Sequence, residues 1–361
     1  MRRFVTGAMI GAVGSLGLLA AADATAQQQQ TQFNDKPFEE NWWPSEWGPD
    51  DKAGSVNRTT PEMVLKAVGL VKQGKTATLG KLYASDIPFF GARGFLLKIP
   101  GTPTGGPFGS NQLVFHDELV TAEIGQVGTQ FDGPGHIGVR TSRGDYFYNG
   151  REREATYTRG PGNMVMGMGD LGVEHVAEKG FVCRGVLLDA TKHRGVNPLP
   201  IPTATDSPGI VTADDVRAMV EAAGIEEIGE GDCVFLYTGH GDLWKTSEWK
   251  DLPPEERRAR AQQFISGEPG FGRSACEYFA ERKIILTGGD TSANDAQPVG
   301  EIEGEAVPCH TELQTRHGIW NIENLDFEQL LADGVSEFLF VWAPLKIVGA
   351  TGSPGNPVAL Y

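Results

Sequence analysis

Asp132 and His136 are the two residues whose types and spacing first indicate chemistry. They lie four residues apart in the stretch 123–136, EIGQVGTQFDGPGH, where glycine and proline predict a loop. Alternating apolar and polar positions precede it, which predicts a strand that ends there. Side chains at a strand end can converge on a small volume, and an imidazole titrates close to working pH, as proton transfer requires. The alternative is that Asp132 only caps the turn and His136 is an ordinary loop residue.

The same stretch resembles the signature of the cyclase family, metal-dependent amidohydrolases that include bacterial kynurenine formamidase and isatin hydrolase. The family pattern is H-x-G-T-H-x-D-x-x-x-H. The Gly-Thr pair at 128–129, Asp132 and His136 match it in register. Gln126 and Gln130 stand where the family has its first two histidines.

Residues 309–326 resemble a second cyclase signature, in which a histidine opens a helix and a glutamate follows a glycine within an E-N-L triplet. His310 and Glu323 carry over onto the family's metal ligands, and Gly318 keeps the register. The residues themselves predict a short helix that ends at Gly318, then a strand that presents Glu323. The alternative is that His310 caps the helix and Glu323 is a surface charge.

The resemblance implies a metal site formed by Asp132, His310 and Glu323, with Gln126 and Gln130 in place of two imidazoles. It implies one or two divalent ions, manganese or zinc. A glutamine amide oxygen is a hard, weak ligand that suits manganese or calcium better than zinc. Loss of the metal with retention of the fold is the alternative.

A metal in this site would lower the pKa of bound water and polarise a carbonyl group. The expected function is therefore a hydrolase of a small amide, lactam or ester that acts on carbon–nitrogen bonds, with His136 as general base. His240, in a Thr-Gly-His-Gly loop after an apolar strand, and Trp47 are the candidate substrate-binding residues. The alternative is a non-catalytic periplasmic binding protein with a degenerate metal site. The sequence contains no G-x-S-x-G elbow of a serine hydrolase.

The elements that must position these residues indicate an α/β protein. Strands are predicted at 77–82, 94–99, 185–189, 233–237, 284–287 and 336–342, and helices at 61–74 and 213–223. A loop at 100–109, rich in proline and glycine, is a candidate substrate lid. The segment 47–57, WGPDDKAGSVN, resembles the opening motif of the longer cyclases, so that the resemblance spans about residues 47–342. It implies a single domain over 41–361, the swivelling β/β/α fold of that family and a homodimer or homotetramer.

The first 26 residues predict a signal peptide. Arg2 and Arg3 precede an apolar stretch at 8–22, and Ala-Thr-Ala at 24–26 is a typical cleavage site. Residues 27–40 are polar and predict a disordered leader. The mature protein is therefore expected in the periplasm or outside the cell, without a membrane anchor.

The net charge limits the classes of binding partner that we expect, and the cysteines bear on disulfide formation. Cleavage removes two arginines and one aspartate, so the net charge of −16 becomes −17. Such an acidic chain repels nucleic acid and anionic membranes, which leaves a small molecule as the expected partner. Export permits disulfides, yet most of the four cysteines lie in apolar segments and are interpreted as buried, unpaired side chains.

Overall fold

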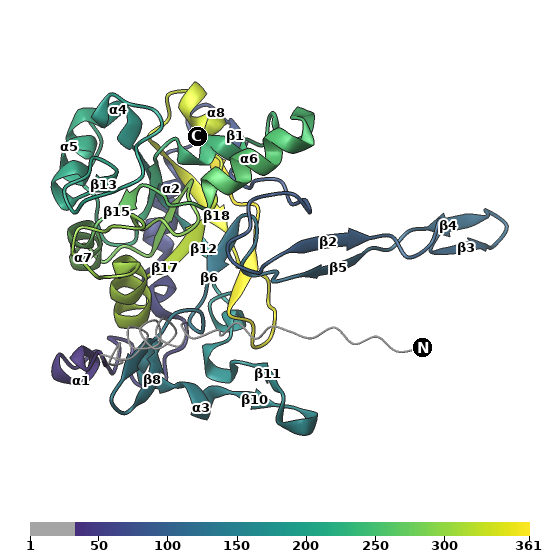
Figure 1. Cartoon of the computed structure of the whole chain (residues 1–361), viewed down its shortest axis with the longest axis horizontal. Helices are drawn as coiled ribbons and strands as arrows, with labels where there is room; N and C mark the ends of the chain where they lie inside the picture. The colour runs from purple at the N-terminus through teal and green to yellow at the C-terminus, as the bar shows by residue number, and fades with distance from the viewer. Residues whose placement is uncertain (1–32) are drawn as a thin grey trace, which may run out of the picture.

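A curled sheet of nine strands forms the centre of the protein (Figure 1), seen in a computed structural model that describes residues 33–361. The predicted signal peptide and residues 27–32 lie outside the described residues. The spatial order of the strands is β1 (Thr76–Thr78), β20 (Val358–Leu360), β18 (Glu337–Trp342), β12 (Phe181–Asp189), β14 (Cys233–Tyr237), β16 (Leu286–Gly289), β17 (Trp320–Glu323), β6 (Gln130–Asp132) and β19 (Gly352–Pro354). The predicted α/β class is confirmed.

The centre of the sheet is parallel and its flanks are antiparallel. Strands β12, β14, β16 and β17 run parallel, whereas β18 and β6 pair antiparallel at the two sides of this block. All five residues of β14 are buried, which explains its continuous apolar sequence, because both faces of the central sheet are covered.

Successive residues of the central strands pack into two cores on opposite faces. Val186 and Leu188 of β12 pack with helices α5 (Ala213–Ala223) and α7 (Arg273–Glu281). Leu187 lies in the other core, together with Phe338 and Phe340 of β18. This alternation follows from the two-residue period of a strand.

The helices begin and end at local signals. Helix α5 starts at a capping box formed by Thr212 and Asp215 and ends at Gly224, whose φ is 63°, as predicted. Helix α2 (Pro61–Val68) also starts as predicted, but it ends at Gly69 rather than at Gly74. The other α-helices in the described part of the chain are α1 (Lys36–Glu39), α3 (Arg153–Thr156), α4 (Ala190–Arg194), α6 (Pro254–Phe264) and α8 (Glu328–Ala332).

Smaller sheets surround the central one. A three-stranded sheet contains β7 (Val139–Thr141), β8 (Gly144–Phe147) and β9 (Arg151–Glu152), and two-stranded pairs are β10 (Thr158–Arg159) with β11 (Val165–Gly167) and β13 (Ile210–Val211) with β15 (Gly270–Phe271). Residues 33–40, predicted as the end of a disordered leader, are ordered against the first of these sheets. The Asn34 amide donates to the Arg140 carbonyl, and Phe38 packs edge-on against Tyr146.

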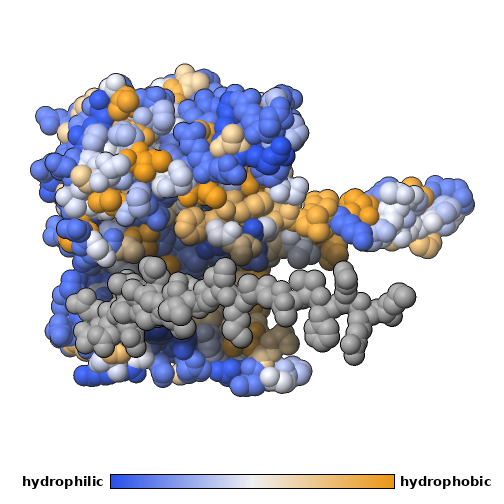
Figure 2. Space-filling view, viewed as in Figure 1, coloured by the Kyte–Doolittle hydropathy of each residue, from blue (hydrophilic) through white to orange (hydrophobic). Residues whose placement is uncertain are grey.

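A two-stranded arm projects from the body of the protein (Figures 1 and 2). Strand β2 (Phe95–Lys98) pairs with β5 (Leu119–Ala122), and β3 (Gly105–Phe108) pairs with β4 (Leu113–Phe115) farther out. Apolar side chains of the arm, including Leu96, Leu97 and Leu119, are exposed. The predicted lid at 100–109 lies in the outer half of this arm, away from the body, which argues against its role as a lid.

All four cysteines are paired, so the expectation of unpaired side chains is wrong. One disulfide joins Cys183 of β12 to Cys233 of the neighbouring β14, and the other joins Cys276 of α7 to Cys309. The partners are 50 and 33 residues apart in the chain, so only the fold reveals that they are neighbours. Disulfides persist in oxidising compartments. Among the described residues, none of the helices has the length and apolarity needed to cross a membrane.

The pairing predicts the thiol content of the protein. Denatured but unreduced protein should react with no equivalent of a thiol reagent such as DTNB, and reduced protein should react with four. A thiol signal before reduction would contradict the pairing.

Candidate metal centre

Two neighbouring strands place two carboxylates on one face of the sheet. In the antiparallel pair of β6 and β17, Asp132 lies opposite Asn321, and Gln130 lies opposite Glu323. Because side chains alternate along a strand, these four polar residues share one face, while Phe131 and Ile322 between them enter the core on the other face. The register of a single strand pair thus brings together carboxylates that are 191 positions apart in the chain.

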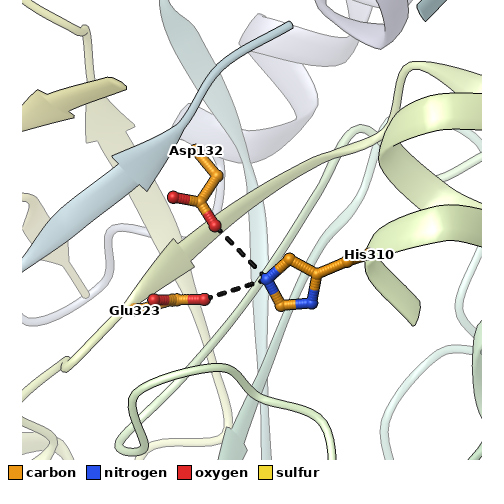
Figure 3. Close-up of side chains that lie close together, drawn as sticks. All are labelled: Asp132, His310 and Glu323. Carbon is orange, nitrogen blue, oxygen red and sulfur yellow. Dashed lines mark ion pairs between the residues drawn. The ribbon is translucent and has the colours of Figure 1, made fainter. Parts of the chain in front are cut away.

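His310 meets the two carboxylates from a third element, the π-helical segment η8 (His310–Arg316) (Figure 3). Its Nε2 lies 3.4 Å from Asp132 Oδ2 and 3.3 Å from Glu323 Oε1. One ligand atom from each of the three residues lies within 4.8 Å of the others, and all three side chains are buried. The sequence-predicted triad therefore converges on one point.

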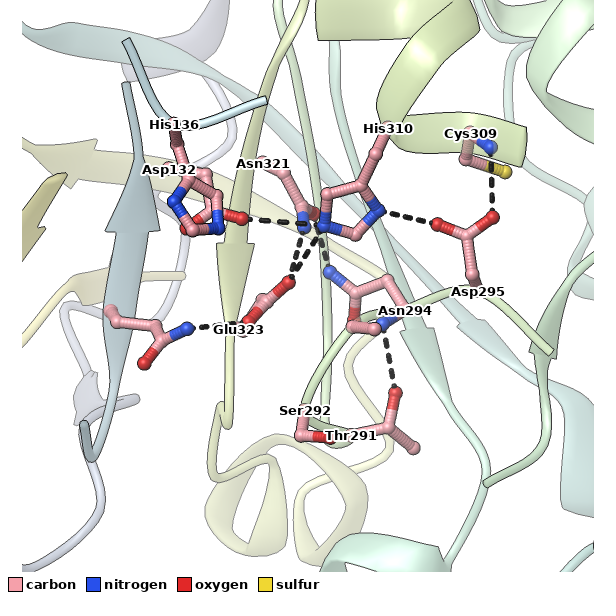
Figure 4. A network of polar contacts seen from close by, with 12 residues as sticks. Asp132, His136, Thr291, Ser292, Asn294, Asp295, Cys309, His310, Asn321 and Glu323 are labelled. Atoms are coloured by element: carbon pink, nitrogen blue, oxygen red, sulfur yellow. Dashed lines mark hydrogen bonds and ion pairs between the residues drawn. The ribbon is translucent and has the colours of Figure 1, made fainter. Parts of the chain in front are cut away.

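A second layer of polar side chains holds these three in place (Figure 4). Asp295 Oδ2 lies 2.6 Å from His310 Nδ1, which turns Nε2 towards the carboxylates. Asn321 donates to Glu323 Oε1 over 2.8 Å, and Asn294 in turn donates to Asn321 Oδ1. A carboxylate behind a histidine is the usual arrangement around a bound metal, because it fixes the tautomer and the ring orientation.

Gln126 and Gln130, which were predicted as ligands, contact the triad through their amide nitrogens. Gln126 Nε2 donates to Asp132 Oδ1 over 3.2 Å, and Gln130 Nε2 donates to Glu323 Oε2 over 2.7 Å. Each glutamine thus binds the carboxylate oxygen that does not face His310. In this geometry the two amide groups orient Asp132 and Glu323, and their nitrogens do not act as metal ligands.

Burial and neighbouring charges shift the pKa values of the three clustered side chains in different directions. Burial by itself raises the pKa of Asp132, but the charges of His136 and His310 outweigh it and bring this pKa down to about 2. Burial lowers the pKa of His310, yet its contacts with the surrounding carboxylates raise it well above the usual value. Burial and the Asp132 charge raise the pKa of Glu323. The buried carboxylates therefore require positive charge beside them.

The donor set fits a divalent cation. Asp132 Oδ2 is buried without a hydrogen-bond donor, although it faces Glu323 and His310. Two carboxylates and a neutral imidazole carry two negative charges, which match one divalent ion, and three protein ligands that leave a position open are typical of catalytic sites. We conclude that the described residues Asp132, His310 and Glu323 can hold a metal.

His136 lies beside the triad, in the turn that follows β6. Its Nε2 is 3.7 Å from Asp132 Oδ1, and its side chain is 18% exposed. Burial lowers the pKa of His136 below its ordinary value, despite the opposing effect of Asp132. The imidazole is therefore neutral near pH 7 and can accept a proton.

The two predicted substrate-binding residues lie elsewhere. The His240 ring is buried, and its Nε2 lies 2.9 Å from the Phe264 carbonyl at the end of α6. Trp47 lies over the Arg58 guanidinium, which donates to the carbonyl of Ile284 before β16 begins. Neither side chain is among those that contact the triad.

The sequence analysis did not predict the roles of Asp295, Asn294 and Asn321, which hold the triad in place. Asn321 had a usable signal, because it lies two positions before Glu323 on the same strand and must share its face. Asp295 gave no such signal. The loop that carries it follows β16 and is held by Glu268, which accepts the backbone amides of Ser292 and Ala293.

The contact between Asp295 and His310 predicts the effect of Asp295→Asn. An asparagine offers one acceptor oxygen for two donors, the Cys309 amide and His310 Nδ1, so the imidazole loses its fixed orientation. Affinity for Mn²⁺ or Zn²⁺, measured by calorimetry, should fall about 10- to 100-fold. The control is Asp290→Asn, a buried acid of the same loop that accepts from Thr238 and Gly241 instead. Equal losses in both variants would contradict the assignment.

Comparison with known proteins places this fold and site in context. The Cyclase family model matches residues 62–296. A crystal structure of a novel cyclase is 27% identical with a TM-score of 0.70, over 91% of this chain and 100% of that one. Isatin hydrolase A from Ralstonia solanacearum is 20% identical with a TM-score of 0.51, over 83% and 97% of the two chains. Isatin hydrolase A from Labrenzia aggregata is 18% identical with a TM-score of 0.51, over 81% and 94%.

No curated protein matches the sequence. The isatin hydrolases share the fold with this chain, and at 18% and 20% identity the likeness concerns the fold alone. The family match, however, spans well over half of the 361 residues and includes the strand that carries Asp132. The protein therefore belongs to the cyclase family, as its sequence motifs predicted.

Proposed function

We propose that this protein is a metal-dependent hydrolase of a small amide, lactam or ester, with carbon–nitrogen bonds as the preferred target. The observation that carries the proposal is the convergence of Asp132 Oδ2, Glu323 Oε1 and His310 Nε2 beside a neutral imidazole. A divalent ion held there would supply Lewis-acid activation of water and of a substrate carbonyl. Manganese suits the oxygen-rich donor set, with zinc as the second candidate.

His136 is the proposed general base. A neutral imidazole that is partly open to solvent can take a proton from a water molecule, and the adjacent Asp132 carboxylate stabilises the imidazolium that forms. Asp132 would then serve two purposes, because Oδ2 faces the ligand atoms while Oδ1 faces His136. The names of the isatin hydrolases that share this fold support a lactam as a first substrate to test.

A non-catalytic binding protein on the same scaffold is the second candidate. The observation that favours it is the pair of glutamine amides, which donate hydrogen bonds to both carboxylates and so satisfy part of their charge without a metal. The two functions differ in metal retention. Stoichiometric manganese or zinc that survives dialysis supports the hydrolase.

Export and self-association belong to the same proposal. The two disulfides support a mature protein in the periplasm or outside the cell. Self-association is supported by the arm of β2 to β5, because an isolated two-stranded ribbon with exposed apolar side chains is marginally stable in water. A second copy of the chain would cover it.

The proposal predicts different behaviour for ligand and base variants. Asp132→Asn or Glu323→Gln removes a charged ligand, so metal content and activity should fall together. His136→Ala should keep its metal and lose about 10²- to 10⁴-fold in turnover, because it removes a proton acceptor and no predicted metal ligand. Metal content is measured by mass spectrometry after dialysis, and turnover is measured on a panel of lactams, amides and esters.

Two outcomes would contradict the hydrolase. One is a parent protein without bound metal and without turnover of any substrate in the panel. The other is full metal retention by Asp132→Asn, since Asp132, with its pKa lowered to about 2, is a negatively charged ligand of the triad.

Self-association predicts a mass change for a variant of the arm. Leu96→Glu places a charge on an exposed apolar position of β2 and should shift the protein to a smaller assembly in light scattering after size exclusion. Leu65→Glu on α2 is the matched control, because that leucine is also exposed but lies outside the arm. A monomeric parent protein would show that the arm is not an oligomer contact.

A further inference from the structure

The disulfide between Cys276 and Cys309 is next to His310, one of the three residues of the metal centre. Cys309 immediately precedes His310, the first residue of η8, and Cys276 belongs to helix α7. Cys276 is fully buried in the core that α7 shares with α5 and the central strands. A covalent bond thus connects a rigid core helix to the residue next to a predicted ligand.

Asp295 extends this connection to the imidazole itself (Figure 4). One carboxylate oxygen accepts the Cys309 backbone amide over 2.8 Å, and the other lies 2.6 Å from His310 Nδ1. The His310 ring is therefore oriented relative to the backbone at Cys309. If Cys309 moves, the direction of His310 Nε2 changes with it.

The chain just before Cys309 has no regular secondary structure and is held to α7 by two side chains: Glu301 accepts the Ser274 amide over 2.7 Å, and Glu305 lies 3.5 Å from Arg273. Residues 298–306 contain no helix or strand, and several of them are exposed or half-buried. Val307 has a φ of 41°, a conformation that a β-branched residue rarely adopts. Noncovalent ties between α7 and η8 are the ion pair of Arg273 with Glu312, 3.0 Å apart, and the packing of Leu313 in the core that contains Cys276.

We infer that the Cys276–Cys309 disulfide is a positioning element of the metal centre, which fixes the start of η8 so that His310 Nε2 meets Asp132 and Glu323. This inference rests on the proposed metal-dependent function. It assigns the two cysteines a role in metal affinity in addition to their role in stability.

The other disulfide provides a matched control. Cys183 and Cys233 join two central strands, and neither residue is adjacent to a triad member. The two bonds close loops of similar length, with partners 33 and 50 residues apart. Because loop-closure entropy varies slowly with length, both should contribute similarly to thermal stability. They should differ only in their effect on the metal centre.

The experiment compares Cys276→Ala/Cys309→Ala with Cys183→Ala/Cys233→Ala. Both variants should lose thermal stability. The first should bind Mn²⁺ about 10-fold or more weakly than the parent in calorimetry, as expected when the support of a metal ligand is removed, and the second should stay within about twofold of the parent. Equal affinity in the first variant and the parent, or equal losses in both variants, would overturn the inference.

A second measurement needs no metal and separates this inference from the proposed function. Hydrogen exchange of the metal-free protein should show faster exchange at residues 309–313 in the first variant and not in the second. A parent that binds no Mn²⁺ would refute the proposed function, and unchanged exchange at 309–313 would refute the positioning role.

A third experiment applies if Cys276→Ala/Cys309→Ala does not fold. In Cys183→Ala/Cys233→Ala protein, one disulfide remains, and reduction in denaturant followed by refolding with the reductant present opens it. Opening should weaken Mn²⁺ binding and accelerate exchange at 309–313, and reoxidation should restore both. Mn²⁺ binding and exchange that stay the same after complete reduction would overturn the inference.

Discussion

The burial of two carboxylates side by side is the constraint on which the rest of this site depends. Asp132 and Glu323 are almost fully buried, and two uncompensated charges at that depth would destabilise the fold. Four neighbouring side chains compensate these charges. Gln126, Gln130 and Asn321 donate N–H groups to the carboxylates, and His310 brings a positive charge between them.

In the cation-free protein, protons supply the compensating charge. The contacts with carboxylates that outweigh burial raise the pKa of His310, while burial and the Asp132 charge raise that of Glu323. A divalent cation in the same place would supply positive charge to the two carboxylates without these protons. The same geometry thus satisfies the electrostatics of folding and the requirements of a metal site.

The sequence predicted the parts of the site that depend on local motifs. The helix that starts at His310 and the strand that ends at Glu323 follow from short-range patterns, and the cyclase signatures linked them to Asp132. Strand β6, which carries Asp132, lies in the stretch that was predicted as a loop, and the strand predicted before that loop forms β4 and β5 of the arm. The role of Asp295 could not be predicted, because it depends on how the loop after β16 meets the start of η8. For the same reason the cysteine pairs were missed, since strand order and helix packing decide which distant residues become neighbours.

Trp47 and the glutamines show two further limits of the sequence motifs. Trp47 belongs to a segment that resembles the family's opening motif, yet its neighbours place it on Arg58, so membership in a motif did not imply contact with the site. The resemblance places Gln126 and Gln130 at histidine positions of the signature, but an amide differs from an imidazole because it presents a donor and an acceptor side by side. With two carboxylates adjacent, the donor faces them. The two glutamines therefore each add a hydrogen bond to a carboxylate of the triad, which fixes the orientation of Asp132 and Glu323.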